Sequence, residues 1–304
     1  MIIKNSELSN IKQEAISLLK GAFDLYLHAA PDGFNRSADY LEVAREAELF
    51  KMAGLVFMDH FFPTTGLTYL TNRIVSKIKC FSSITISRCI GGFNAEAVEQ
   101  ALKEGAKIIF FPTLDSCYFR NWCLSRPYLK HLINKLSLKE SSNCKILDNQ
   151  RKITREVYNI LLLLKKYGVI LSLGHLSPNE TFIVIENAQK LGIKKIKIQH
   201  PQSKSGLSLN QQIELSSKGV YMSYTFLNCL SEHGQQLSVK DLVYMIKAVG
   251  AERSILSSDA GQSNLPRHID ILKNFISSLL FHGISSKEIS RMIKDNPRHL
   301  LLDV

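Results

Sequence analysis

Eight short apolar runs alternate with helical patterns along most of this chain, and that alternation constrains its fold more than any other feature. The runs are rich in β-branched and aromatic residues and are almost continuously apolar, which is typical of parallel strands covered on both faces. The expected strands are Phe23–His28, Leu55–His60, Ile84–Ile90, Lys107–Thr113, Val169–His175, Lys195–His200, Val220–Thr225 and Ser254–Asp259. This rhythm predicts an α/β chain built on a parallel sheet.

The segments between the runs carry helix signals. Apolar residues within Tyr40–Ala47 recur at helical spacing, which predicts one buried helix face. Ser177, Ser208 and Ser285 each precede a Glu or Gln by three residues, the pattern of a capping box at a helix start. An additional helix is expected before the first strand, over about Leu8–Leu18, and another after the last strand.

The number of repeated units predicts a closed barrel. Eight units between about residues 22 and 282 average roughly 33 residues, close to the size of a (β/α)8 TIM barrel. A doubly wound open sheet is the alternative, but the turn after the first strand, LHAAPDGF, lacks the expected glycine-rich pattern. A length of 304 residues allows two domains. We nevertheless expect a single barrel domain over residues 1–304, with an extra N-terminal helix, a C-terminal helix and a long insertion at about residues 114–155, between the fourth strand and its helix.

Ionisable side chains close five of the eight runs. They are His28, His60, His175, His200 and Asp259. A single histidine at a strand end is usually a satisfied polar residue, but a barrel directs the carboxyl ends of its strands toward one volume. Neutral imidazoles and a carboxylate are a common ligand set for a catalytic divalent metal that keeps one position open for water. The strand ends therefore predict a metal site.

The order of these residues and their neighbours resembles a known superfamily. The relevant segments are Tyr26-Leu-His28, Gly174-His175, Gln199-His200 and Ser258-Asp259-Ala-Gly-Gln262, followed by Asp295-Asn-Pro-Arg-His-Leu-Leu301. In this order they resemble the amidohydrolase superfamily of metal-dependent hydrolases. The stretches around His28, His60 and His175 are similar, more narrowly, to a poorly characterised branch of that superfamily.

The resemblance implies a ligand set and a reaction. His28, His175, His200 and Asp259 would bind one divalent metal, with zinc as the first choice and manganese or iron as alternatives. The reaction would be hydrolysis of an amide, lactone or ester bond in a small anionic molecule, with metal-activated water as the nucleophile. Asp259 would be the general base, with His200 and His60 as further catalytic residues. Asp59 would either orient His60 or stand at a helix N-terminus.

Two positions depart from the pattern. Tyr26 stands where the superfamily has the first histidine of its His-x-His pair, and Met58 stands where the narrower branch has a lysine. A phenol with a pKa near 10 is a poorer metal ligand at neutral pH than imidazole. Tyr26 is therefore also a candidate substrate-binding residue. The alternative function is a catalytically silent barrel that binds a ligand or a protein partner.

The net charge of +11 is concentrated in one place. The segment 114–155 holds nine basic and three acidic residues, with aromatic residues near its start. One interpretation is a lid in which Arg120 or Arg126 grips an anionic substrate, and Arg36 is a second candidate for that role. The other interpretation is a subunit interface or a solvated loop.

The remaining expectations concern partners and location. A small-molecule substrate and a homo-oligomer are expected, whereas the chain shows no nucleic-acid-binding module or basic stripe. The polar start MIIKNSELSNIKQE has no signal-peptide core, and no segment is apolar enough for a membrane span, so a cytoplasmic protein is expected. The six cysteines form no Cys-x-x-Cys pair and are expected to be reduced thiols.

Overall fold

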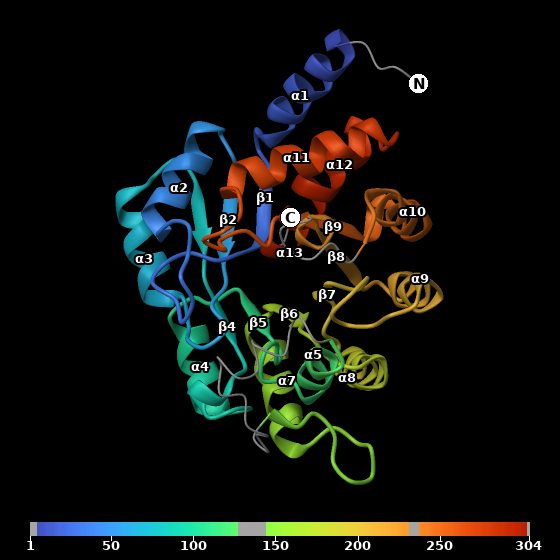
Figure 1. Ribbon diagram of the computed structural model, residues 1–304. Coiled ribbons are helices and arrows are strands. Elements are labelled where there is room, and N and C mark those ends of the chain that lie inside the picture. The colour runs from blue at the N-terminus through green and yellow to red at the C-terminus, as the bar shows by residue number, and fades with distance from the viewer. Residues whose placement is uncertain (1–4, 127–143, 231–236, 303–304) are drawn as a thin grey trace. The chain divides into compact units, whose positions relative to one another are not determined.

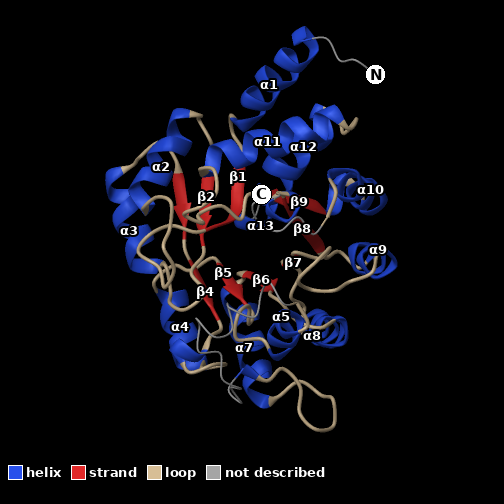
Figure 2. Cartoon of the chain, in the orientation of Figure 1, coloured by secondary structure: helices blue, strands red, loops and turns tan. Residues whose placement is uncertain are grey.

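The computed structural model describes residues 5–126, 144–230 and 237–302, and within them strands and helices alternate along the chain (Figures 1 and 2). The chain divides into two compact units. The first comprises Met1–Met58, Gly66–Phe81 and Ser223–Val304, and the second comprises Asp59–Thr65 and Ser82–Met222. The expectation of a single domain over residues 1–304 stays a prediction, and each unit is described separately below.

The first unit contains a parallel sheet in the order β1-β2-β3, with Phe23 paired to Gly54 and Gly54 paired to Lys79. Strand β9 lies against β1, and helix α1 packs on α11. Its elements are α1 (Asn5–Leu19), β1 (Phe23–Leu27), α2 (Tyr40–Leu49), β2 (Gly54–Phe57), most of α3 (Thr65–Ile74), β3 (Lys79–Phe81), the end of β8 (Tyr221–Thr225), η4 (Leu227–Cys229), α10 (Val239–Val249), η6 (Ala251–Arg253), β9 (Ser254–Ser257), α11 (His268–Phe281), α12 (Ser286–Ser290), η7 (Arg291–Asp295) and α13 (Asn296–Leu302).

The second unit contains parallel strands in the order β4-β5-β6-β7, followed by the start of β8. The register places Phe110, Ser172 and Lys197 side by side on β5, β6 and β7. Its elements are β4 (Ser83–Thr85), η1 (Arg88–Ile90), α4 (Ala95–Lys103), β5 (Ile108–Phe110), α5 (Cys117–Leu124), α7 (Arg155–Tyr167), β6 (Ile170–Leu173), α8 (Pro178–Lys190), β7 (Ile196–Gln199) and α9 (Leu209–Ser217).

Each predicted run contains a strand, but the third run is wrong over part of its length. The expected strand Ile84–Ile90 forms only β4, and its last three residues form the 3-10 helix η1. The carboxylate of Asp115 explains the turn, because it accepts hydrogen bonds from the main-chain N–H of Arg88 at 2.8 Å and from its Nε at 2.7 Å. Strand β3, just before β4, was not expected.

Seven of the eight predicted strands are too long at their carboxyl ends, while Val220–Thr225 ends with β8 at Thr225. Every predicted strand-closing His or Asp lies one to three residues beyond the last paired residue. His200 and Asp259 adopt φ values of 53° and 56°, which a strand does not allow. The side chains singled out by the sequence therefore stand on the first turn of each βα loop.

The helix signals are confirmed. Ser177, Ser208 and Ser285 form complete capping boxes, and the expected N-terminal and C-terminal helices are α1 and α13. The insertion at 114–155 begins with helix α5 and ends where α7 begins, while its residues 127–143 lie outside the described ranges.

The burial of the strands on both faces explains why their sequences are almost entirely apolar. All residues of β1, β2, β5, β6, β7, β8 and β9 are buried, as expected for parallel strands covered on both faces.

All six cysteines are free, as predicted, and burial raises the pKa of Cys80 to about 12, which keeps its thiol protonated. Within the described ranges, no helix has both the length and the apolar character needed to cross a bilayer.

Candidate active site

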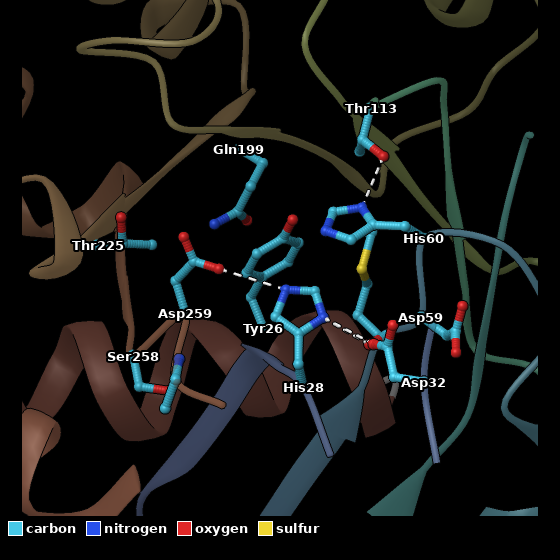
Figure 3. A network of polar contacts seen from close by, with 12 residues as sticks. Tyr26, His28, Asp32, Asp59, His60, Thr113, Gln199, Thr225, Ser258 and Asp259 are labelled. Atoms are coloured by element: carbon cyan, nitrogen blue, oxygen red, sulfur yellow. Dashed lines mark hydrogen bonds and ion pairs between the residues drawn. The ribbon is translucent and has the colours of Figure 1, made fainter. Parts of the chain in front are cut away.

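His28 and Asp259 form the central pair of the first unit. The Nδ1 atom of His28 lies 2.9 Å from the carbonyl oxygen of Met58, and Nε2 lies 3.4 Å from Oδ1 of Asp259 (Figure 3). A carbonyl oxygen only accepts, so Nδ1 carries a proton. If the ring is neutral, the lone pair of Nε2 faces the carboxylate of Asp259, which is unfavourable for both groups. A bound cation, or a second proton on Nε2, would stabilise this arrangement. An imidazole held through its other nitrogen by a main-chain carbonyl is a common arrangement for a metal ligand.

Close contact between the ends of β1 and β9 brings this pair together. The main-chain N–H of Asp259 donates to the carbonyl of Tyr26 at 2.9 Å, and the N–H of His28 donates to the carbonyl of Ala260 at 2.8 Å. Gly261 has a φ of 126°, and a Cβ atom there would overlap the carbonyl oxygen of His28. Only glycine allows both this conformation and this approach.

Tyr26 is a neutral phenol beside His28. Its ring is buried and meets the imidazole edge-on, with ring centres 5.3 Å apart. Burial raises the pKa of the Tyr26 phenol well above its usual range, and the nearby Asp259 carboxylate raises it further. The residue is therefore a hydrogen-bonding phenol at neutral pH, and not a phenolate ligand.

Asp24 is a buried carboxylate that sequence reasoning missed. It accepts hydrogen bonds from the main-chain N–H of Tyr26 at 3.1 Å and of Ser258 at 3.1 and 3.2 Å, and its Oδ2 lies 3.1 Å from Nε2 of His268. Both side chains are almost completely buried. Asp24 on β1 is thus hydrogen-bonded to Ser258, the residue that precedes Asp259. Its only sequence signal is a charge inside an apolar strand run.

Arg36 holds a carboxylate of its own chain. Its Nε and Nη2 atoms lie 2.8 and 2.6 Å from Oδ2 of Asp32, and both side chains are almost entirely buried. The guanidinium also lies 5.3 Å from the centre of the Phe34 ring. In the structure, Arg36, which was predicted to bind the anionic substrate, therefore forms an ion pair with Asp32.

His175 and His200 form a second pair, in the second unit. Both are buried, and their ring centres lie 5.5 Å apart. Two imidazoles that share a tetrahedral zinc ion have ring centres about 5 Å apart, given Zn–N bonds of about 2.1 Å. The ring centres of His175 and His200 are separated by a similar distance.

Packing and hydrogen bonding position His175. Ser116 donates a hydrogen bond to its carbonyl at 2.5 Å, and the Phe119 ring packs at 4.5 Å from its imidazole. A Cβ atom on the preceding Gly174 would overlap the carbonyl oxygens of Phe111 and Pro112. The helix α5, inside the predicted insertion, therefore supports a predicted metal ligand.

His60 and Asp59 lie in the second unit, after β2 in the chain. His60 is half-buried, and its Nδ1 lies 2.9 Å from the hydroxyl oxygen of Thr113 (Figure 3). Asp59 accepts hydrogen bonds from the main-chain N–H groups of Phe61 and Phe62 at 2.6 and 3.1 Å. These bonds close a turn after β2, so the expectation of a carboxylate at a helix N-terminus is wrong: α3 begins only at Thr65.

Lys197 and Gln199 are fully buried on β7, and sequence reasoning missed both. The ammonium of Lys197 donates to Oε1 of Gln199 at 2.7 Å and lies 5.0 Å from the centre of the Phe110 ring. A lysine inside an apolar strand run is the signal that could have identified this pair.

The two arginines of the insertion lie on or beside α5. Arg120 is within the helix. Arg126 follows it and stacks over the Trp122 ring at 4.2 Å, while its Nη1 donates to the Trp122 carbonyl at 3.1 Å. Arg126 thus stabilises the end of the helix.

The predicted ligands occur as one pair in each unit. Over residues 5–126, 144–230 and 237–302, no group of three or more His, Cys, Asp or Glu side chains is arranged to hold a metal ion. Each unit therefore holds one pair of candidate donors: His28 with Asp259 in the first unit, and His175 with His200 in the second.

Comparisons with known proteins identify the fold. Residues 21–223 match the model of a family described as a family of unknown function, DUF6282. No curated protein matches the chain. A lactonase from Listeria monocytogenes aligns with a TM-score of 0.62 at 11% identity, over 94% of this chain and 95% of that one.

Two further structures agree. An organophosphorus hydrolase from Deinococcus radiodurans has a TM-score of 0.55 and 13% identity, over 94% of this chain and 93% of its own. An amidohydrolase from Pseudomonas aeruginosa has a TM-score of 0.52 and 12% identity, over 95% and 97%. These likenesses confirm the predicted fold class, the TIM-barrel class, and the predicted resemblance in fold to the amidohydrolases.

Proposed function

The chain belongs to the family of unknown function DUF6282 and has the amidohydrolase fold, and from this premise we propose that it is a metal-dependent hydrolase. Its substrate is a small anionic molecule with an amide, lactone or ester bond. One observation carries this proposal: Nε2 of His28 faces Oδ1 of Asp259 at 3.4 Å while Nδ1 is held by a main-chain carbonyl.

We assign one divalent cation to the donors His28, His175, His200 and Asp259, with zinc preferred over manganese or iron. Three imidazole nitrogens and a carboxylate oxygen match the ligand preferences of zinc. When bound, such a cation polarises a carbonyl oxygen and makes water a better nucleophile at neutral pH.

The residues of the chain supply positioning and proton transfer. Asp259 accepts a proton from the attacking water, as a carboxylate general base does. His60 and His200 are the further candidates for proton transfer. Tyr26, which remains neutral, can donate a hydrogen bond to a substrate oxygen. Arg36, Arg120 and Arg126 are the candidates for binding the anionic group of the substrate, because a guanidinium pairs well with a carboxylate or phosphate.

Hydrolysis of simple substrates tests this function. Purified protein is assayed with γ-butyrolactone, an N-acyl homoserine lactone and p-nitrophenyl acetate, before and after EDTA treatment and after readdition of zinc. We expect at least one substrate to be hydrolysed, with activity lost in EDTA and restored by zinc. Asp259→Asn should lower kcat by about 100-fold or more, because it removes the general base. Activity that survives both EDTA and this substitution would contradict the proposal.

A second candidate function is supported by Tyr26. A neutral phenol occupies the position where the resemblance places an imidazole ligand. A barrel that has lost catalysis and binds a ligand or a protein partner would tolerate this exchange.

Self-association of the chain is a further prediction, which sedimentation can test.

A further inference from the structure

We infer that the side-chain amide of Gln199 is a fixed hydrogen-bond donor for a negatively charged oxygen of a ligand, and that Lys197 orients and strengthens this donor. Both residues are fully buried in the second unit. The Nε2 atom of Gln199 has no hydrogen-bond partner among the residues that the structure describes. A buried polar group left in this state destabilises the protein unless a partner binds it.

Lys197 determines which way the amide points. An ammonium has three donors and no acceptor, so the Gln199 atom 2.7 Å from it must be the carbonyl oxygen Oε1. The NH2 group must then be on the other side of the amide. A 180° flip would set two donors against each other, so the orientation of the amide is fixed before any ligand binds.

The backbone beneath this pair is also fixed. Ser205 donates a hydrogen bond to the main-chain carbonyl of Gln199 at 2.9 Å and lies 3.3 Å from that of Gly174. The β6–β7 register pairs Lys197 with Ser172, which holds the lysine in the sheet. Neither the strand nor the amide needs to move to present the NH2 group.

The charge of Lys197 selects the chemistry of the ligand. A cation on the carbonyl oxygen of an amide withdraws electron density from its nitrogen, so the N–H groups become stronger donors. Stronger donors favour an acceptor with negative charge, and a carboxylate oxygen is the simplest example. If the chain is the proposed hydrolase, this carboxylate belongs to the anionic substrate or to the acid released from it. Only this identification of the ligand rests on the proposed function.

Acetate is the probe for this donor. The full-length protein is labelled with 15N-glutamine, and the NH2 signals of Gln199 are identified by their absence in Gln199→Met. Sodium acetate is then titrated against sodium chloride at equal ionic strength. We expect a saturable shift of the Gln199 NH2 signals with acetate and none with chloride. Signals that do not respond to acetate would overturn the inference, and would indicate an internal water as the partner.

Lys197→Met tests the positioning role. It removes the donor to Oε1 at similar side-chain length, so the affinity for acetate should fall at least tenfold. Lys197→Gln keeps a neutral donor to Oε1 and should bind acetate more tightly than Lys197→Met. Equal affinity in the wild type and both variants would overturn the role of Lys197. If neither variant folds, the wild-type titration still tests the donor.

A matched control and the assay of hydrolysis separate this inference from the proposed function. Gln189→Glu changes charge at an exposed glutamine of the same unit and should leave the acetate titration unchanged. Acetate binding at Gln199 without hydrolysis of any tested substrate would refute the hydrolase and keep the donor. Hydrolysis without an acetate response would do the reverse.

Discussion

Tyr26→His is expected to tighten the binding of zinc by about tenfold or more, because changes beside a metal ligand commonly alter affinity by about 10- to 100-fold. Burial and the Asp259 carboxylate keep the pKa of the native phenol well above neutrality, so the phenol supplies no anionic oxygen. An imidazole at this position supplies a neutral lone pair beside His28, whose ring centre lies 5.3 Å from that of Tyr26.

Competition with a zinc-binding dye measures this change. Tyr26→Phe is the matched control, since it keeps the ring and removes the hydroxyl, and its affinity should equal that of the wild type. If Tyr26→His binds zinc no more tightly than Tyr26→Phe, residue 26 does not contribute to metal binding.

Asp24→Ala is expected to lower the free energy of unfolding by about 3 kcal/mol, because it leaves several buried hydrogen-bond donors without an acceptor, at about 1–3 kcal/mol each. The substitution leaves the main-chain N–H groups of Tyr26 and Ser258 without their acceptor, and removes the carboxylate facing His268. Because Ser258 directly precedes Asp259, zinc affinity should fall as well.

Urea denaturation followed by circular dichroism measures the stability. Asp24→Asn keeps one acceptor oxygen and should lose less stability than Asp24→Ala. Asp270→Ala, at an exposed position of α11, should change stability by no more than about 0.5 kcal/mol. A loss in Asp24→Ala as small as that of the Asp270 control would show that the buried pair stabilises nothing.

The fold was largely predictable because its determinants are local. Parallel strands buried on both faces need apolar runs, and capping boxes such as Ser177–Glu180 mark helix starts within four residues. The strand ends were not predictable to the residue. Asp259, for example, adopts a left-handed conformation and bonds to a distant segment, through the hydrogen bond from its N–H to the Tyr26 carbonyl.

The candidate site was predictable only where side chains stand at strand ends. His28 and Asp259, and separately His175 and His200, lie together in the structure. Asp24 and Lys197 were missed because both lie inside apolar runs, where a pattern of apolar residues hides a single charge. The partner of Asp24, the N–H of Ser258, is 234 residues away in the chain, and no spacing rule connects them.

Metal content is the most direct test of the central claim. Protein purified without chelator is analysed by mass spectrometry of its elements, as wild type, His28→Ala, His175→Ala and His299→Ala, the last being an exposed histidine that serves as the control. We predict about one zinc, manganese or iron per chain in the wild type and in His299→Ala, and a loss of metal in the other two variants. Wild-type protein that is metal-free and takes up no added divalent ion would contradict the account and favour a silent, ligand-binding barrel.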